Sequence, residues 1–290
     1  MATAGQWLEG ARPRTLPAAV APVLAGTGAA ALVDSVRPIR ALLALVVALA
    51  LQVAVNYAND YSDGVRGTDA DRVGPLRLVG SGAATPSAVK RAAFLAFGVA
   101  AAAGLVLAAL TSWWLVLVGL AAILAAWGYT GGPRPYGYAG LGELFVFVFF
   151  GLVAVCGTTY VQVGRVTAVS VVCAVAIGFL ACALLVANNL RDIPTDAVTG
   201  KQTLAVRLGD RRTRSLYVLL VGLALLAPVV LALAGNPWSL LALICLPLAV
   251  RAARPVLSGA VGRALVPVLK ATGQTELVFA IGLLVGLALS

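Results

Sequence analysis

Residues 39–63 read IRALLALVVALALQVAVNYANDYSD, an apolar run that ends in a cluster of amide and acidic side chains. A run of about 20 apolar residues is long enough to cross the hydrocarbon core of a bilayer as one helix. Hydrophobic residues make up 61% of the 290 residues and charged residues only 11%, whereas a soluble domain has about 25% charged residues. The sequence therefore predicts an all-α polytopic membrane protein.

Nine apolar runs in the chain are bounded by charges or turn residues. They fall at residues 16–33, 39–59, 91–111, 113–129, 141–163, 166–188, 216–234, 238–250 and 275–290. The first could be mistaken for a signal peptide, because Arg12 and Arg14 precede it, but its two prolines and the many runs behind it favour a retained helix. We expect nine transmembrane helices that form a single domain over residues 1–290 around a central cavity.

Basic residues are distributed unevenly over the loops, and this asymmetry sets the orientation of a membrane protein. With the N-terminus inside, 18 of the 21 Lys and Arg residues fall on inside segments, and only Arg37, Arg40 and Arg165 fall outside. The net charge of +10 is therefore read as the charge of orienting loops in contact with a lipid bilayer, with no nucleic-acid partner. We expect a multi-pass protein of the cell (inner or plasma) membrane with a cytoplasmic N-terminus and a cytoplasmic active face.

Two residue types limit the chemistry that this chain can perform. The sequence contains no histidine, and its four cysteines all lie inside apolar runs without forming a CxxC pair. This composition excludes a zinc site, a haem-ligating histidine and an imidazole base, so attention turns to the 11 acidic residues.

Two acidic clusters end the second and sixth apolar runs: NDYSD at residues 59–63 and DIPTD at residues 192–196. Asn56 stands four residues before Asp60, and Asn188 stands four before Asp192, so each pair shares one helix face. Pro194 predicts that the second of these helices kinks or ends there. The repeated spacing is typical of an internal duplication, which would place the clusters opposite each other across the cavity, open to the cytoplasmic side.

Carboxylates grouped in this way suit a divalent cation and a diphosphate. Mg²⁺ prefers oxygen ligands and typically takes one or two carboxylates plus phosphate oxygens of a substrate, and it neutralises a diphosphate leaving group so that the carbon–oxygen bond breaks more readily. We predict that the metal ligands are Asp60, Asp63, Asp192 and Asp196 and that these four act in catalysis together with Asn56. The predicted substrate-binding residues are Asn59, Arg66, Arg72, Arg77, Arg134, Tyr138, Asn188, Arg191 and Lys201.

Three groups of residues have two readings. A Gly-Pro-rich turn is either part of an aromatic-acceptor pocket or an interfacial aromatic belt, and it is flanked by Tyr129, Arg134, Tyr136, Tyr138 and Glu143. Asp69 and Asp71 are either further ligands or ordinary charges of a solvated loop. The phenylalanines of residues 145–150 are expected to face lipid or fill the packing rather than to stabilise a cation.

The two clusters resemble the aspartate-rich motifs of the UbiA superfamily of intramembrane aromatic prenyltransferases, and the resemblance spans nearly the whole chain. Longer stretches are similar to those of the 1,4-dihydroxy-2-naphthoate polyprenyltransferases of menaquinone synthesis: NYANDYSD (56–63), GTD (67–69), DRVGPLR (71–77), NNLRD (188–192) and GKQTLAVRLG (200–209). The superfamily often has a third acid four residues after the second acid of its first motif. This chain has Gly67 there, with Asp69 two places further on.

The resemblance implies a specific reaction. Mg²⁺ would hold an allylic polyprenyl diphosphate between the two clusters, and ionisation would give an allylic cation. The ring of 1,4-dihydroxy-2-naphthoate would attack this cation with loss of CO2 and diphosphate, giving demethylmenaquinol. No covalent enzyme nucleophile is needed, and the long prenyl tail implies a lateral opening toward lipid between helices.

Three alternatives stay open at the level of sequence. A cation or proton transporter would place acids in the middle of several helices, whereas these clusters lie at two membrane exits. A phosphotransferase acting on nucleotide-linked alcohols would need one continuous motif from Asp-Gly to Ala-Arg, and Gly67-Thr68 stands where Ala-Arg is required. Within the superfamily, the acceptor could instead be hydroxybenzoate, homogentisate or haem.

Overall fold

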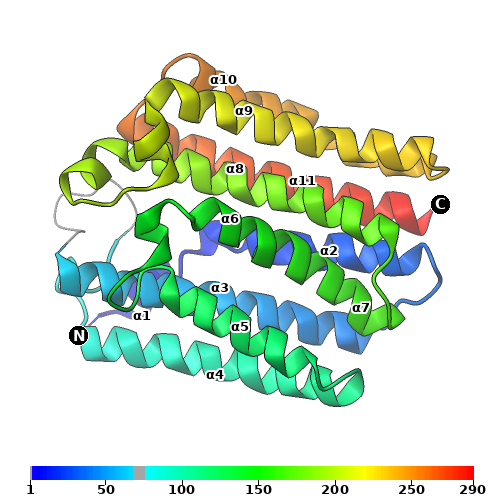
Figure 1. Ribbon diagram of the computed structural model, residues 1–290, viewed down its shortest axis with the longest axis horizontal. Coiled ribbons are helices and arrows are strands. Elements are labelled where there is room, and N and C mark those ends of the chain that lie inside the picture. Colours follow the sequence, from blue (N-terminus) through cyan, green and yellow to red (C-terminus); the bar gives the residue numbers. More distant parts are fainter. Residues whose placement is uncertain (1, 68–75) are drawn as a thin grey trace.

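Long helices run side by side along one axis of the molecule (Figure 1). The computed structural model describes residues 2–67 and 76–290, and these residues form helices and no β-strand. The helices are α1 (Ala4–Gly10), α2 (Pro17–Ala31), α3 (Pro38–Arg66), α4 (Pro86–Leu110), α5 (Leu115–Gly128), α6 (Gly142–Val146), α7 (Gly157–Val163), α8 (Ala168–Val198), α9 (Leu204–Leu233), α10 (Leu246–Leu257) and α11 (Val266–Ala288). Shorter elements are η1 (Pro13–Thr15), η2 (Tyr136–Ala139), the π-helix η3 (Phe147–Cys156), η4 (Pro237–Cys245) and η5 (Gly262–Leu265). The all-α class is confirmed.

Seven helical segments in the described part of the chain are long and apolar enough to cross a membrane. They are Pro38–Arg66, Pro86–Leu110, Gly142–Val163, Ala168–Val198, Leu204–Leu233, Pro237–Leu257 and Gly262–Ala288. The helices α2 and α5 are apolar but shorter. Each of the nine expected runs therefore corresponds to an apolar helix and the protein is a multi-pass membrane protein, while nine membrane crossings stay a prediction.

Helix starts follow local sequence signals. Proline occupies the first turn of α2, α3 and α4, where its missing N–H would have no intrahelical partner. Thr85 caps α4 by accepting from the Ala88 amide, and Thr167 and Ser170 form a capping box at the start of α8. These caps satisfy amides that would otherwise be unpaired at the helix starts.

Both motif-bearing helices run further than the apolar pattern predicts. α3 ends at Arg66 and α8 at Val198, so both acid clusters lie on helices. Pro194 lies inside α8 and does not end it, so the expectation of an end there is wrong. An interior proline removes one hydrogen bond and crowds the carbonyl of the preceding turn. The Thr195 hydroxyl donates to the Asp192 carbonyl at 3.0 Å and adds a hydrogen bond in this turn.

The hydrophobic packing forms two clusters. One joins α2, α8, α9, η4, α10 and α11 around side chains such as Ile177, Tyr217 and Phe279, and the other joins α3 and α4 around Tyr57 and Phe97. η3 approaches α8 so closely at Gly151 that a Cβ there would lie 2.7 Å from the Gly178 Cα. Small residues of this kind allow helix backbones to pack tightly within a membrane.

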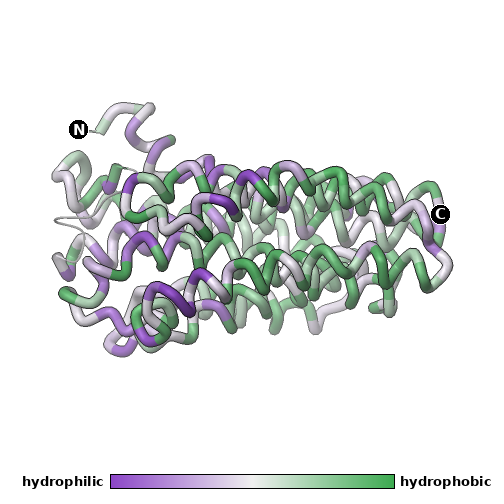
Figure 2. The backbone as a smooth tube through the Cα atoms, turned by 90° about the horizontal axis from the view of Figure 1, so that it is seen from above, coloured by the Kyte–Doolittle hydropathy of each residue, from purple (hydrophilic) through white to green (hydrophobic). Residues whose placement is uncertain are grey.

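The two ends of the bundle differ in polarity. Hydrophilic residues gather at the end where the N-terminus lies, and the opposite end is apolar (Figure 2). The links that follow α5, α8 and α10 lie at the polar end, whereas the turns after α4, α7 and α9 lie at the other end with the C-terminus (Figure 1). Both acid clusters lie at the polar end, because they occupy the last turns of α3 and α8 and both helices end there.

Candidate functional site

A cavity of about 1580 Å³ lies inside the bundle and receives side chains from both motif-bearing helices. Its polar lining from α3 and α8 includes Asn56, Asn59, Asp63, Asn188, Arg191 and Asp196. The duplication hypothesis predicted that the two clusters face one shared cavity, and these residues do so. Arg77, Tyr138 and Lys201 join them from the connecting segments.

Asp63 is the carboxylate on which these segments converge. The Tyr138 hydroxyl donates to Asp63 Oδ1 at 2.7 Å, and Asp63 Oδ2 lies 3.3 Å from Lys201 Nζ and 3.6 Å from Arg77 Nη2. The Asp63 side chain is only 3% exposed, so these contacts operate at low local dielectric, where they are stronger than in water. The result is an acid at the cavity wall held between two cations and a phenol.

Asp60 does not line the cavity. Its Oδ2 accepts from the Leu78 amide at 2.8 Å and its Oδ1 accepts from the Val79 amide at 3.0 Å. The side chain is almost fully buried at 1% exposure. Asp60 therefore anchors the segment that places Arg77 beside Asp63.

In the second motif, as in the first, one acid lines the cavity and the other is held by protein groups away from it. Arg191 forms a two-point ion pair with Asp192, with Nε 2.6 Å from Oδ1 and Nη2 2.7 Å from Oδ2, and Nη2 also donates to Asn188 Oδ1 at 2.9 Å. Asp192 does not line the cavity, whereas Asp196 does. The Asp196 carbonyl accepts from the Lys201 amide at 2.9 Å, which ties the end of α8 to the basic residue beside Asp63.

These residues fit a magnesium ion held with a substrate, but not one enclosed by protein alone. Among the described residues, no group of three or more His, Cys, Asp or Glu side chains lies close enough to hold a metal ion. Mg²⁺ typically takes one or two carboxylates and completes its shell with water and phosphate oxygens. Asp63 and Asp196 offer that number of carboxylates at the cavity wall.

The other predicted binding residues separate into two groups. Asn59 lines the cavity, and its Oδ1 accepts from the Thr130 hydroxyl at 2.7 Å. Arg66 instead donates to the carbonyls of Thr130 and Gly132 and lies over the Tyr138 ring, so it holds the 129–140 segment from outside the cavity. Arg134 is exposed and does not line the cavity. The roles of Arg66 and Arg134 in substrate binding stay predictions, and Arg72, Asp69 and Asp71 lie outside the described residues.

The cavity lining also contains aromatic residues and several polar residues that had no predicted role in the site. Phe145, Phe149 and Phe150 line the cavity, whereas the sequence predicts that they face lipid or fill the packing rather than stabilise a cation. Tyr136 lines it as well, where burial raises the pKa of its hydroxyl, and this hydroxyl donates to the Ala125 carbonyl at 2.8 Å. Further lining residues, singled out only by the structure or noted only as loop charges, are Arg12, Thr15, Gln52, Arg263 and Lys270. A glutamine inside an apolar run, four residues before Asn56, was the available signal for Gln52.

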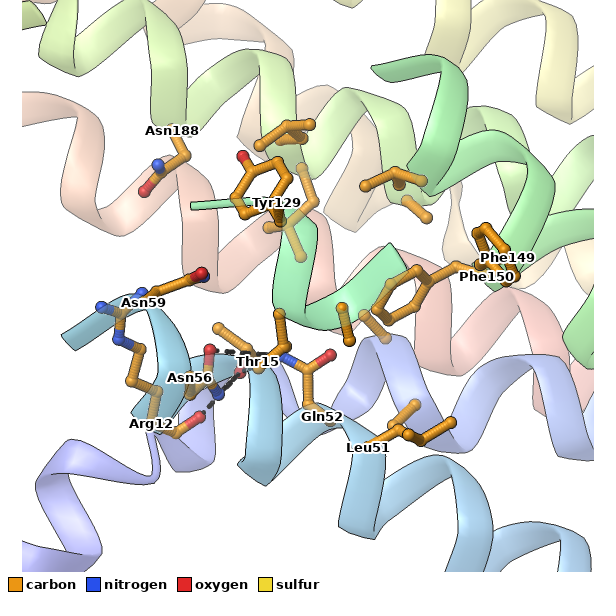
Figure 3. Close-up of a pocket in the computed structure, with 18 of the residues that line it drawn as sticks. Arg12, Thr15, Leu51, Gln52, Asn56, Asn59, Tyr129, Phe149, Phe150 and Asn188 are labelled. Carbon is orange, nitrogen blue, oxygen red and sulfur yellow. Dashed lines mark hydrogen bonds between the residues drawn. The ribbon is translucent and has the colours of Figure 1, made fainter. Parts of the chain in front are cut away.

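The cavity changes character along its length. Figure 3 shows amide and basic side chains such as Arg12, Asn59 and Asn188 in one part of it and Leu51, Phe149 and Phe150 in another. The lining follows α3 from Asp63 to Ala44, which corresponds to about 28 Å at the rise of an α-helix. Such a cavity can hold a charged head at one end and a long apolar chain at the other.

Comparisons with known proteins agree with this geometry. A family model described as the UbiA prenyltransferase family matches residues 19–260. A 1,4-dihydroxy-2-naphthoate octaprenyltransferase of Mycobacterium tuberculosis is 59% identical over 288 residues, covering 99% of this chain and 98% of the relative. The protein of the same name in Escherichia coli is 41% identical over 291 residues, covering 96% of this chain and 94% of the relative.

Solved structures show the same fold. A UbiA homolog from Archaeoglobus fulgidus bound to GPP and Mg²⁺ has a TM-score of 0.70 at 15% identity and covers 98% of this chain and 99% of that one. The apo structure of a UbiA homolog from Aeropyrum pernix K1 has a TM-score of 0.71 at 15% identity, with coverage of 92% and 97%. The chain belongs to the UbiA prenyltransferase family.

Proposed function

We propose that this protein transfers a polyprenyl group from an allylic polyprenyl diphosphate to 1,4-dihydroxy-2-naphthoate. CO2 and diphosphate are lost, and the product is demethylmenaquinol, an intermediate of menaquinone biosynthesis. The cavity is the main support for prenyl transfer, because it joins a charged end around Asp63 to an apolar end along α3. The choice of acceptor is supported by near full-length relatives that carry the name of this activity at 59% and 41% identity.

Cationic side chains at the polar end bind the diphosphate. Arg77, Arg191 and Lys201 all line this part of the cavity, and guanidinium and ammonium groups form strong charge-assisted hydrogen bonds to phosphate oxygens. Arg191 is already oriented by its contacts with Asp192 and Asn188. The diphosphate is thus held by groups whose positions are set before it arrives.

The acidic residues would hold Mg²⁺ against that diphosphate. Asp63 and Asp196 offer carboxylates at the cavity wall, and bound magnesium would neutralise the leaving diphosphate. Asp60 and Asp192 would join the metal shell only by exchanging their present partners, which are the amides of Leu78 and Val79 and the guanidinium of Arg191. Asp63 would likewise exchange contacts with Tyr138 and Lys201 when it binds the metal. With those partners kept, both acids position the cations that bind the substrate.

The prenyl tail and the aromatic ring occupy the rest of the cavity. Val47, Leu51 and Phe149 belong to its apolar lining, where a polyprenyl chain is shielded from water. Excluding water protects an allylic cation from hydrolysis until the aromatic ring reaches it. Stacked aromatic rings such as Tyr136 and Phe145, whose centroids are 3.8 Å apart, provide flat apolar walls.

The orientation in the membrane is part of the same proposal. All 290 residues act as one transmembrane domain with nine crossings, and the polar end that carries both motifs faces the cytoplasm. The uneven distribution of Lys and Arg supports this orientation, as does the gathering of hydrophilic residues at that end (Figure 2). In a cysteine-free background, Ser87→Cys and Thr199→Cys should be labelled from the cytoplasmic side and Arg165→Cys from the other side, and the reverse pattern would refute it.

The acceptor is tested with purified protein, Mg²⁺ and a radiolabelled polyprenyl diphosphate. We expect transfer of the label to 1,4-dihydroxy-2-naphthoate and none to 4-hydroxybenzoate or homogentisate. Transfer to hydroxybenzoate with no reaction of the naphthoate would refute the acceptor and leave the transferase reading in place. Absence of transfer to every acceptor would refute the transferase reading itself.

A further inference from the structure

Gln52 is a buried amide on the wall of the cavity, one helical turn further into the bundle than Asn56. It is 7% exposed and lines the cavity together with Asn56 and Thr15. Figure 3 shows these three side chains close together, with Tyr129, Phe149 and Phe150 coming from other elements around the same pocket. A polar side chain at this depth needs hydrogen-bond partners, because its burial without them is costly.

The Thr15 hydroxyl determines which way the Gln52 amide is turned. A hydroxyl has one hydrogen to donate and two lone pairs with which to accept. The Thr15 hydroxyl donates to the Arg12 carbonyl at 2.9 Å, so it accepts from Gln52 Nε2 at 2.9 Å and from Asn56 Nδ2 at 3.0 Å. The Asn56 amide is itself fixed, because Nδ2 also donates to the Ala11 carbonyl at 2.9 Å.

Both hydrogens of the Gln52 amide are thereby used. Nε2 donates to Thr15 Oγ1 and, at 3.5 Å, to Asn56 Oδ1. A flipped amide would place the carbonyl oxygen against a hydroxyl that has no hydrogen left to donate. The nitrogen therefore faces Thr15, and Oε1 lies on the other side of the amide group.

Gln52 Oε1 is buried and has no hydrogen-bond partner among the described residues. A buried acceptor without a donor is destabilising, and the exceptions in folded proteins call for an explanation. The oxygen belongs to a cavity residue, so the donor can come from a bound molecule. Because the oxygen can only accept, the group that meets it must carry an O–H or N–H, and a carboxylate would be repelled.

We propose that Gln52 is a specificity-determining residue for the aromatic acceptor and that its Oε1 accepts a hydrogen bond from a ring hydroxyl. This inference rests on the proposed function, in which the acceptor is a naphthoate with two hydroxyl groups. Thr15 and Asn56 hold the amide nitrogen, so the oxygen is fixed on the opposite side of the amide group, where the hydroxyl would meet it. Acceptors that lack this hydroxyl leave Oε1 unpaired and are discriminated against.

The test combines variants with substrate analogues. Binding to purified protein is measured calorimetrically for 1,4-dihydroxy-2-naphthoate and for the two naphthoates that lack either the 1-hydroxyl or the 4-hydroxyl. In the natural protein, loss of the hydroxyl that meets Gln52 should weaken binding about tenfold. In Gln52→Met, which keeps a side chain of similar length without an amide, the same loss should change binding less than twofold.

Controls separate a specific contact from a general disturbance. Val53→Met changes a neighbouring residue of α3 that does not line the cavity and should keep the penalty for the missing hydroxyl. Gln52→Leu serves as a second apolar variant, and affinity for polyprenyl diphosphate should stay within about twofold of the natural protein in both Gln52 variants. Loosened packing alone would weaken the binding of both substrates, whereas the proposal predicts a change for the acceptor and none for the diphosphate.

Two results would overturn the role of Gln52. One is an equal penalty for the missing hydroxyl in the natural protein and in the Gln52 variants. The other, which needs no variant, is that removal of neither hydroxyl weakens binding to the natural protein. Failure of the proposed function is a different result, because the natural protein would then not prenylate the naphthoate in the transfer assay with Mg²⁺ and a polyprenyl diphosphate.

Discussion

Asp63 Oδ2 lies 3.3 Å from Lys201 Nζ, and this contact joins the end of α3 to the segment that follows α8. The two residues come from different motifs, separated by more than a hundred positions in the sequence. Tyr138 contacts both, through a hydrogen bond to Asp63 at 2.7 Å and a ring centroid 4.6 Å from Lys201 Nζ. Carboxylate, ammonium and phenol thus form one unit at the polar end of the cavity.

Asp63→Asn should weaken magnesium binding more than it weakens the fold. The substitution removes one negative charge at the cavity wall, so the Mg²⁺ concentration for half-maximal activity should rise by about tenfold to a hundredfold. Magnesium titration of prenyl transfer measures the effect. Asp34→Asn is the matched control, since Asp34 is exposed in the α2–α3 link, and an unchanged magnesium dependence in Asp63→Asn would contradict the proposed ligand role.

Asp60→Asn should behave differently, because Asp60 accepts hydrogen bonds from two backbone amides. Asparagine offers only one acceptor oxygen, and its amide nitrogen would face an N–H donor. The free energy of unfolding should fall by about 1–3 kcal/mol, together with turnover, because Arg77 would no longer be held beside Asp63. Thermal unfolding in detergent measures the loss, and a midpoint equal to that of Asp63→Asn would argue against the anchoring role.

Ala48→Phe should shorten the prenyl chain that the protein accepts. Ala48 lines the cavity on α3, about 22 Å along the helix from Asp63 at 1.5 Å per residue. A phenyl group there would fill the apolar end, so turnover with long polyprenyl diphosphates should fall at least about tenfold while geranyl diphosphate is used as before. A competition assay with both diphosphates checks this, and equal loss for short and long chains would contradict the path along α3.

Glu276 should destabilise the fold and take no part in prenyl transfer. It is fully buried in α11, and neither carboxyl oxygen has a hydrogen-bond partner among the described residues. Glu276→Met should therefore raise the free energy of unfolding by about 1–3 kcal/mol and leave prenyl transfer unchanged. Thermal unfolding and turnover are measured together, and a stable variant without activity would show that the carboxyl has a function.

The sequence predicted much of this architecture for physical reasons that can be named. Apolar runs between charges located the helices, because lipid requires each spanning segment to satisfy its own backbone. The repeated Asn-to-Asp spacing on α3 and α8 predicted a shared cavity, and Asn56 and Asn188 line one, whereas Asp60 and Asp192 do not. The acids at its wall are Asp63 and Asp196. Resemblance to a known family supplied the reaction, which the spacing of acids alone could not provide.

Other features depended on contacts between distant segments. The amides that hold Asp60 come from residues 78 and 79, and no local pattern predicts that a loop folds back onto that carboxylate. The sequence predicts that Phe149 faces lipid or fills the packing, and it does not reveal that η3 is a π-helix. The wider turn of a π-helix changes which side chains of η3 face the cavity. The orientation of the Gln52 amide can be recognised only from its hydrogen bond to Thr15, which lies on a different element.

The most direct test of the central claim follows the carboxyl carbon of the acceptor. Purified protein is supplied with Mg²⁺, a polyprenyl diphosphate and 1,4-dihydroxy-2-naphthoate labelled in its carboxyl group. We predict one labelled CO2 released for each prenylated product, with both lost when the metal is chelated. A prenylated product that keeps the labelled carboxyl, or transfer that continues at full rate in the presence of chelator, would contradict the account.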